Sequence, residues 1–213
     1  MRKINRCIKR VPSSPIFYIA DTCFFVYRYF DEAKITDPHE KQRALQAKQY
    51  WTVIDGQCKS GLAKVFILDV CIAEAFKTLA KKYYGSSGIF PSTAHYDAAK
   101  KRLSKDVSFS ARDAKKAQRN VRFHDIQTSR DIIIGVDRFF ENTLKKHPRV
   151  GIVDLLILST ARYLIDFLGF DRDRLHIITM DNRLYKLARG YAELPSAFNP
   201  DVPADLAAKV FIP

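Results

Sequence analysis

Three short apolar segments constrain the fold of this chain most strongly. They are residues 16–20 (IFYIA), 64–68 (KVFIL) and 175–179 (LHIIT), and they are rich in β-branched and aromatic side chains. Such runs are typical of strands that are buried on both faces. Because long stretches with helical spacing separate them, they need crossover connections and are expected to run parallel. The sequence therefore predicts an α/β fold built on a parallel sheet.

Apolar spacing places helices between and after these strands. The expected helices cover residues 38–54, 70–83, 130–145, 154–168 and 182–189. Asp69 is expected to cap the second of them and Gly85 to end it. The fourth is apolar nearly all round, so we expect it to be buried. The third presents one apolar face, formed by Ile132, Ile133, Val136, Phe140 and Leu144. The final residues, KVFIP, are expected to add an edge strand.

Composition indicates one soluble globular domain. The chain has 213 residues, of which 47% are hydrophobic and 28% charged, enough to bury a substantial core. We expect a single domain over residues 1–213 with an insertion at about 86–125. Turn signals introduce that insertion (Gly85-Ser-Ser-Gly88 and Pro91-Ser92), and its Ala and Lys content favours a helical hairpin that projects from the body.

Positive charge is concentrated in two segments. The net charge is +13, of which residues 1–10 carry +5 and residues 100–122 carry +7. A local basic excess is typical of a surface that meets phosphates. A solvated hairpin is the ordinary alternative. The expected nucleic-acid-binding residues are Lys100, Lys101, Arg102, Arg112, Lys115, Lys116, Arg119 and Arg122.

Cysteine usage and hydropathy indicate a cytoplasmic protein. The four cysteines (Cys7, Cys23, Cys58 and Cys71) form no C-x-x-C motif and have mostly apolar neighbours, as expected of reduced, buried thiols. No apolar run approaches the roughly 18 residues of a membrane span. The basic N-terminus followed by IFYIADTCFFV is not expected to act as a signal peptide, because Asp21 interrupts the apolar region and no small-x-small cleavage site follows.

Four acidic residues occupy comparable positions along the chain. Asp21 directly follows the first strand, and Asp181 follows the strand expected at 175–179 by two residues. In an open parallel sheet, ligands bind beyond the carboxyl ends of the strands. Asp154 opens the buried helix, where the helix dipole favours a carboxylate. Glu74 lies one turn into the helix that follows the second strand. All four are therefore expected at one mouth of the sheet.

Each acid also has an ordinary structural explanation. Asp21, Asp154 and Asp181 could cap helices or stabilise turns. Glu74 could pair with Lys77 or Lys81 on a solvated helix face. The functional interpretation therefore depends on the set of four acids.

The order of these elements resembles the PIN-domain nucleases. The matching pieces are FYIADT, DVCIAEAFKTLA, VDLLILSTA and IITMDNRL, followed by FNP at 198–200 as the closing strand. They fall within residues 16–22, 64–80, 152–165 and 175–200, somewhat under a third of the chain. The gap between Glu74 and Asp154 is long for a compact member of the family, and the basic insertion fills it.

The resemblance implies a three-layer α/β/α fold and a divalent-metal-dependent ribonuclease. Asp21, Glu74, Asp154 and Asp181 would bind Mg²⁺ or Mn²⁺, with Thr22, Thr179 and Asn182 orienting them. Hard cations of this kind prefer oxygen ligands. They activate water, so no side-chain nucleophile is needed. The toxin members of the family further imply RNA as substrate, an antitoxin protein as partner and self-association as a homodimer.

Three other readings compete. A haloacid-dehalogenase-type phosphohydrolase would need D-x-D after the first strand, where this chain has Asp21-Thr22-Cys23. A nucleotide-binding Rossmann or P-loop protein would need a G-x-G-x-x-G or G-x-x-x-x-G-K motif, which the eight glycines do not form. The third is a non-catalytic PIN-like RNA-binding or scaffolding module, which stays open because the presence of the acids does not prove turnover.

Overall fold

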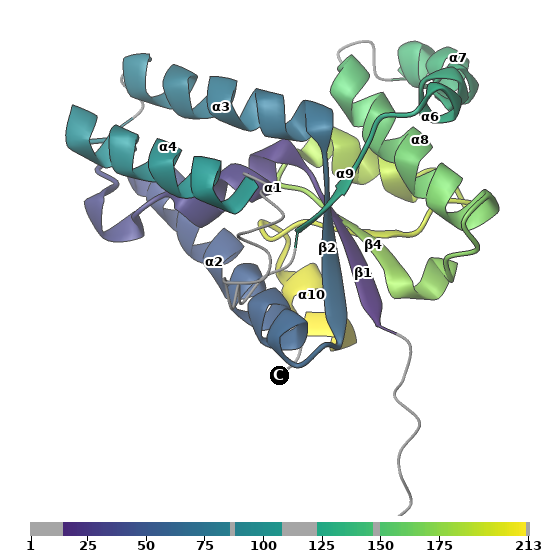
Figure 1. The fold of residues 1–213 in the computed structure, drawn as a ribbon, viewed down its shortest axis with the longest axis horizontal. Helices are drawn as coiled ribbons and strands as arrows, with labels where there is room; N and C mark the ends of the chain where they lie inside the picture. Colours follow the sequence, from purple (N-terminus) through teal and green to yellow (C-terminus); the bar gives the residue numbers. More distant parts are fainter. Residues whose placement is uncertain (1–14, 86–87, 108–122, 147–149, 212–213) are drawn as a thin grey trace, which may run out of the picture.

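A five-stranded parallel sheet forms the centre of the protein (Figure 1). The computed structural model describes residues 15–85, 88–107, 123–146 and 150–211. The strands are β1 (Ile16–Ala20), β2 (Ala63–Leu68), β3 (Phe123–Ile126), β4 (Leu175–Ile178) and β5 (Ser196–Phe198). Their order across the sheet is β3-β2-β1-β4-β5, and every neighbouring pair is parallel. The three strands expected from the sequence are confirmed.

Helices cover both faces of the sheet. The longer ones are α2 (Pro38–Lys59), α3 (Asp69–Tyr84), α4 (Thr93–Val107), α6 (Arg130–Gly135), α7 (Asp137–Lys146), α8 (Ile152–Asp166) and α9 (Asn182–Arg189). Short turns of helix are α1 (Thr22–Val26), η1 (Tyr27–Tyr29), η2 (Glu32–Lys34), η3 (Arg172–Arg174), α10 (Pro203–Leu206) and η4 (Lys209–Phe211). Helices α2, α3 and α4 lie on one side of the sheet and α8 lies on the other (Figure 1). The expected three-layer α/β/α architecture is confirmed.

The order of the strands reverses at β1. The chain runs outward from β1 to β2 and β3, and then returns to the other side of β1 to form β4 and β5. Tyr18 therefore pairs with Val65 on one side and with His176 on the other. The crevice at such a reversal point, beyond the carboxyl ends of the strands, is where open α/β sheets bind ligands. Residues that follow β1 and β4 lie at this point.

Several predicted helix boundaries need correction. Asp69 does not cap α3, because it is the first helical residue and Leu68 occupies the cap position. Helix α2 runs five residues past its expected end at 54, and its start is fixed by Asp37, whose carboxylate accepts a hydrogen bond from Glu40 N (2.7 Å). Helix α8 begins and ends two residues earlier than expected, which leaves Phe167 and Leu168 exposed.

The region expected to form a projecting helical hairpin differs from that expectation. Its first half is α4, which packs on α3 and buries Tyr96, Ala99 and Leu103. Residues 123–126 form the edge strand β3, which the sequence analysis did not predict. Residues 108–122 lie outside the described part of the chain.

The C-terminal segment also differs from its prediction. Lys209–Phe211 forms a turn of 3-10 helix, and the expected edge strand is wrong. The Phe211 ring packs 4.2 Å from that of Tyr50 and 5.9 Å from that of Tyr18. Burial of this ring in the core therefore decides the conformation of the segment.

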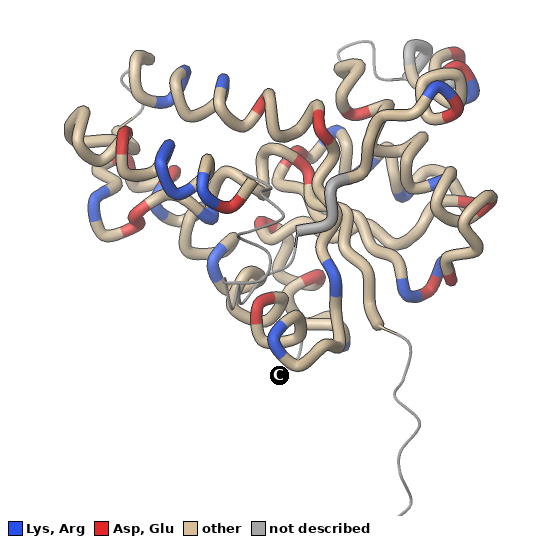
Figure 2. Tube along the Cα trace, viewed as in Figure 1, with Lys and Arg blue, Asp and Glu red and all other residues tan. Residues whose placement is uncertain are grey.

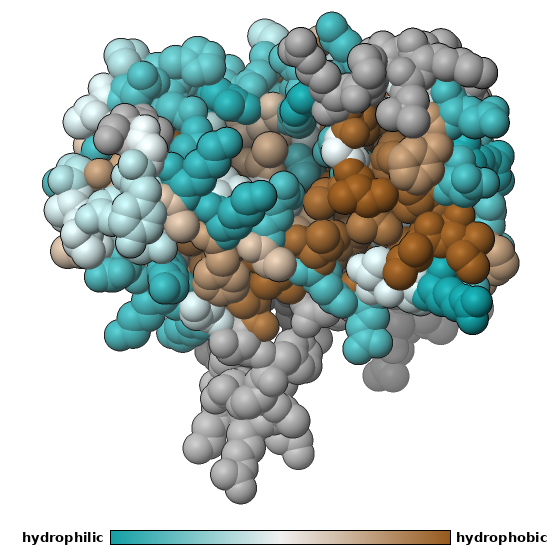
Figure 3. All heavy atoms as spheres, turned by 90° about the horizontal axis from the view of Figure 1, so that it is seen from above, coloured by the Kyte–Doolittle hydropathy of each residue, from teal (hydrophilic) through white to brown (hydrophobic). Residues whose placement is uncertain are grey.

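The expected helix at 130–145 is broken in two at Val136. A Cβ atom on Gly135 would lie 2.5 Å from Ser159 Oγ, so glycine lets α6 lie directly against α8. The buried residues are Ile132, Val136 and Phe139, whereas Ile133 and Ile134 are 56% and 60% exposed. The predicted apolar face is therefore wrong at Ile133 and at Phe140, which is 37% exposed while its neighbour Phe139 is buried. Figure 3 shows the molecule from above, with apolar side chains gathered on the side where Figure 1 draws α6 and α8.

Three cysteines are described, and all are free thiols. Cys71 is buried, and Cys23 and Cys58 are partly buried. Among the described helices, none is long and apolar enough to cross a membrane.

His176 is a polar residue in the middle of the core. It lies in β4 with 4% of its surface exposed, between the rings of Tyr18 and Phe198. Within the described part of the chain, neither ring nitrogen has a hydrogen-bond partner. Burial, together with the nearby charge of Arg174, lowers the pKa of His176 from 6.5 to about 4.

This lowered pKa makes stability depend on pH. The unfolded chain binds a proton at His176 below about pH 6.5, but the folded chain does so only near pH 4, so stability is lost as pH falls through this window. Between pH 7 and pH 5 the loss is about 2 kcal/mol. We expect the free energy of unfolding, measured by urea denaturation, to fall by that much more in the parent than in His176→Phe. Equal losses in both proteins would contradict an uncharged, buried His176.

Candidate functional site

Asp21 lies at the reversal point of the sheet. Its backbone N–H donates to Ile178 O (2.9 Å), which extends the pairing of β1 with β4 by one residue. The residue is only 3% exposed, and its carboxylate does not cap α1. Oδ2 accepts a hydrogen bond of 2.7 Å from the hydroxyl of Thr179. A buried carboxylate is therefore held by a neutral donor.

The charges of the other three acids act on the Asp21 carboxylate. Burial raises the pKa of Asp21 to about 7; the Thr179 hydrogen bond opposes this shift, and the charges of Asp154, Glu74 and Asp181 reinforce it. The charge of Asp21, followed by burial, likewise raises the pKa of the Cys23 thiol. The charges of Asp154, Glu74 and Asp181 therefore act on Asp21 from within electrostatic range.

Thr179 joins two of the acids. Its backbone N–H donates to Phe198 O (3.0 Å), which fixes it between β4 and β5. Its hydroxyl oxygen donates to Asp21 and accepts from the backbone N–H of Asp181 (2.9 Å). A single buried hydroxyl therefore orients the Asp21 side chain and the Asp181 backbone.

Asp181 and Asp154 are engaged in local contacts. Asp181 caps α9, and its carboxylate accepts from the backbone N–H and the guanidinium of Arg183. Although burial works to raise it, the pKa of Asp181 is held below its usual value by these hydrogen bonds. Asp154 is the third residue of α8, and its Oδ2 accepts from Gly151 N (3.0 Å). Burial nevertheless raises the pKa of Asp154, and the charge of Asp181 adds to this shift.

Glu74 lies in the second turn of α3 and is partly buried. In the described residues it makes no hydrogen bond or ion pair, so the alternative of a pair with Lys77 or Lys81 is not seen. Thr22 is buried at the start of α1, but in the same part of the chain its hydroxyl has no hydrogen bond to any of the four acids.

The set of donors suits a divalent cation of the Mg²⁺ or Mn²⁺ kind. The four acids offer hard oxygen ligands, and the buried Asp21 carboxylate meets three like charges. A cation would relieve both its burial and this repulsion. As the side chains stand, no three Asp, Glu, His or Cys residues of the described chain converge closely enough to hold a metal ion. Asp154 accepts from Gly151 N, and Asp181 is paired with Arg183.

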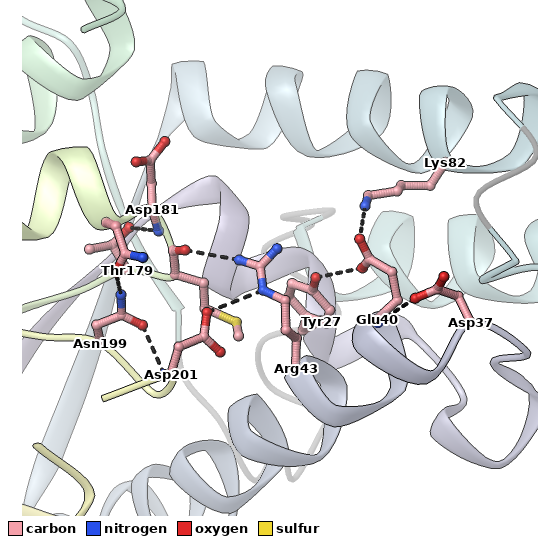
Figure 4. Close-up of polar contacts among 11 residues, drawn as sticks. Tyr27, Asp37, Glu40, Arg43, Lys82, Thr179, Asp181, Asn199 and Asp201 are labelled. Atoms are coloured by element: carbon pink, nitrogen blue, oxygen red, sulfur yellow. Dashed lines mark hydrogen bonds and ion pairs between the residues drawn. The ribbon is translucent and has the colours of Figure 1, made fainter. Parts of the chain in front are cut away.

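Arg43 ties the site to α2 (Figure 4). Its guanidinium donates to the carbonyl of Met180 (2.9 Å), next to Asp181, and to Asp201 Oδ2 (3.2 Å). The same guanidinium lies 5.5 Å from the centre of the Tyr27 ring. Arg43 therefore clamps the segments that follow β4 and β5.

Further hydrogen bonds surround this clamp (Figure 4). The Tyr27 hydroxyl donates to Glu40, which also accepts from Lys82. Asn199, fully buried, donates its side-chain amide to Asn182 Oδ1 (2.7 Å) and accepts from Asp201 N (2.9 Å). Asn182 thus contacts the loop after β5, and none of its described hydrogen bonds reaches the acids.

The expected nucleic-acid-binding residues are described only in part. Lys100 and Lys101 are exposed on α4, whereas the Arg102 guanidinium donates to Tyr29 O (2.6 Å). Figure 2 shows Lys and Arg recurring along both α3 and α4. The remaining expected residues, Arg112, Lys115, Lys116, Arg119 and Arg122, lie outside the described part of the chain.

Two arginines that contact the site, Arg43 and Arg183, were not among the predicted site residues. Arg43 gave no signal, because its partners follow it by more than 130 residues and only the fold brings them together. Arg183 had a signal in the spacing Asp181-Asn182-Arg183 at a helix start, where an Asp cap and a side chain two residues later can meet.

Comparisons with known proteins do not assign a family. No family model matches the chain, and no curated protein matches its sequence. Among solved structures, the chain is similar to a chain in the crystal structure of VapBC2 from Rickettsia felis bound to a DNA fragment from their promoter. The identity is 12%, the match covers 86% of this chain and 98% of that one, and the TM-score is 0.49. This similarity is too remote to support a functional inference.

The Arg43 clamp should contribute to stability. Arg43→Gln leaves the partly buried carboxylate of Asp201 and the carbonyl of Met180 without their donor, and we expect a loss of about 2 kcal/mol in urea denaturation. Arg172→Gln is the matched control, because Arg172 also donates to a backbone carbonyl, that of Ala192, but from an exposed side chain. Its loss should stay within about 0.5 kcal/mol. Equal losses would show that the clamp adds nothing beyond a surface contact.

Proposed function

We propose that this protein is a divalent-metal-dependent ribonuclease of the PIN type. The observation that carries the proposal is the environment of Asp21. This carboxylate is buried at the reversal point of a parallel sheet, is held by one threonine hydroxyl and meets the charges of three further acids. Such an arrangement costs stability in the absence of a cation, which is a common property of sites built for chemistry.

The chemistry follows from this set of acids. Asp21, Glu74, Asp154 and Asp181 would hold the cation. When bound, Mg²⁺ or Mn²⁺ activates water for attack on phosphorus and neutralises the charge that develops there. Thr179 keeps the Asp21 carboxylate and the Asp181 backbone in fixed relation. Arg43 holds the carbonyl of Met180, so the segment that carries Asp181 is anchored on both sides.

RNA is the proposed substrate because of the charge distribution and the sequence resemblance. Residues 100–122 carry +7, and Lys100 and Lys101 are exposed on α4 beside α3, the helix that carries Glu74. Basic side chains that meet phosphates release condensed counterions, which favours binding of any nucleic acid. A toxin role with an antitoxin partner, and a homodimer, extend this proposal on the resemblance alone. The alternative is a non-catalytic PIN-like RNA-binding or scaffolding module.

Replacing either Asp21 or Asp154 should greatly slow cleavage. We expect Asp21→Asn and Asp154→Asn to cut RNA in Mn²⁺ or Mg²⁺ at least about 100-fold more slowly than the parent, because each loses a charged oxygen ligand. The control is Asp173→Asn, in which an exposed carboxylate ahead of β4 is changed in the same way. Cleavage rates are measured on purified proteins with a labelled single-stranded RNA. Undiminished cutting by the Asn variants would contradict the site, and binding without cutting by the parent would favour the non-catalytic module.

Metal binding can be followed without RNA. By mass action, Mn²⁺ should raise the melting temperature of the parent and do much less for Asp21→Asn. Without metal at pH 8, Asp21→Asn should melt no lower than the parent, because the substitution removes a buried charge whose pKa is about 7. Equal metal-induced shifts in the two proteins would argue against a cation at Asp21.

The basic segment can be tested through salt dependence. In Lys115→Gln/Lys116→Gln/Arg119→Gln, the slope of log affinity for single-stranded RNA against log salt concentration should flatten by about 2, if each side chain meets a phosphate. The control replaces the exposed Lys59, Lys64 and Lys209, an equal loss of charge from outside this segment. If the slope changes only in the control, or in neither variant, the basic segment does not contact RNA phosphates and is a solvated surface.

A further inference from the structure

Arg183 contacts the Asp181 carboxylate through both its backbone N–H and its guanidinium. Asp181 Oδ1 accepts from the backbone N–H of Arg183 (2.7 Å) and from its Nε (3.3 Å). Oδ2 accepts from Arg183 Nη2 (2.8 Å). The planar guanidinium therefore grips both oxygens of the carboxylate, the geometry in which Arg recognises carboxylates most strongly.

The field of this guanidinium extends beyond Asp181. The charge of Arg183 also favours the ionised form of Asp154, and so works against the rise in the pKa of Asp154. The Arg183 side chain is 53% exposed, whereas that of Asp181 is 18% exposed. The pair thus lies with its cation toward solvent and its anion toward the other acids. From the solvent side of the site, Arg183 therefore offsets part of the negative charge of Asp181 and Asp154.

We propose that Arg183 is an internal cation that occupies Asp181 until a divalent metal replaces it, and that it then faces a phosphate of the substrate. This inference rests on the proposed function. A divalent ion needs Asp181 as an oxygen ligand, so the guanidinium and the metal compete for the same carboxylate. Direct repulsion between the guanidinium and the ion acts in the same direction.

Displacement of the guanidinium gives it a second use. Once the metal takes the carboxylate, the rigid fork of N–H donors on Arg183 loses this acceptor but remains at the exposed mouth of the site. A phosphate oxygen of RNA presents the same kind of acceptor. Arg183 therefore lowers metal affinity in the free protein and raises affinity for RNA in the loaded one, which are two effects of opposite sign.

The first effect is measured with Mn²⁺ alone by calorimetric titration of the full-length protein. Arg183→Gln should bind Mn²⁺ about fivefold more tightly than the parent, the size expected from loss of a half-exposed ion pair. Arg189→Gln is the matched control, because Arg189 is an exposed arginine on the same helix that also lies near a carboxylate, that of Asp205. The control should bind Mn²⁺ like the parent. Unchanged or weaker Mn²⁺ binding by Arg183→Gln would overturn the inference.

A double-mutant cycle separates the pair from general charge. In an Asp181→Asn background the carboxylate is gone, so the further change Arg183→Gln should tighten Mn²⁺ binding less than it does in the parent. The same tightening in both backgrounds would show that Arg183 acts only by repelling the ion. That result would overturn competition for Asp181.

The second effect is measured with RNA under saturating Mn²⁺. Arg183→Gln should raise KM for a single-stranded RNA about tenfold, the loss of one charge-assisted contact to phosphate. Arg183→Lys, which keeps the charge, should recover part of this loss. A parent-like KM in Arg183→Gln would overturn the phosphate contact.

Failure of this inference is distinguishable from failure of the proposed function. If Mn²⁺ binds the parent, is lost in Asp21→Asn and is unaffected by Arg183→Gln, the metal site stands and the competition is wrong. If neither the parent nor Arg183→Gln binds Mn²⁺, the metal site itself is wrong.

Discussion

The pairing of β1 with β4 is the interaction on which the rest of the site depends. It continues one residue beyond the strands through Asp21 N–H and Ile178 O, and it places Thr179 opposite Asp21. Because the strand order reverses at β1, the point beyond the carboxyl ends of β1 and β4 is where an open α/β sheet forms its ligand-binding crevice. A carboxylate can therefore be buried there and still lie at an opening of the sheet.

Burial of this carboxylate sets the electrostatics of the region. Three other acids add to the free-energy cost of ionising Asp21. Thr179 forms hydrogen bonds with the Asp21 carboxylate, after β1, and with the Asp181 backbone N–H, after β4. Positive charge reaches the site from two sides, through Arg43 from α2 and through Arg183 from α9. Arg43 donates to the backbone carbonyl of Met180, and Arg183 pairs with the Asp181 carboxylate, which the proposed reaction needs. Packing of the core around Tyr18, Tyr50 and Phe211 offsets the free-energy cost of such a site.

Local patterns were sufficient wherever one segment decided its own structure. The apolar run at residues 16–20 and the short helix at 182–189 were predicted with the bounds that β1 and α9 have. Predictions were wrong where distant packing overrode the local pattern. Close approach of Gly135 to Ser159 divides the helix expected at 130–145, and burial of Phe211 prevents the expected terminal strand. Strand β3 carries too little local signal, because its pairing with β2 defines it.

The sequence by itself determined the parallel α/β fold and the positions of Asp21 and Asp181 after two strands, because strand periodicity and the rule for carboxyl edges depend only on local order. Tertiary structure decided which acids meet and how each is held. It buries Asp21 beneath Thr179, directs Asp154 to Gly151 N and Asp181 to Arg183, and brings Arg43 to Met180. Side-chain partners far apart in the chain are set by packing and charge compensation in three dimensions, which residue spacing does not encode.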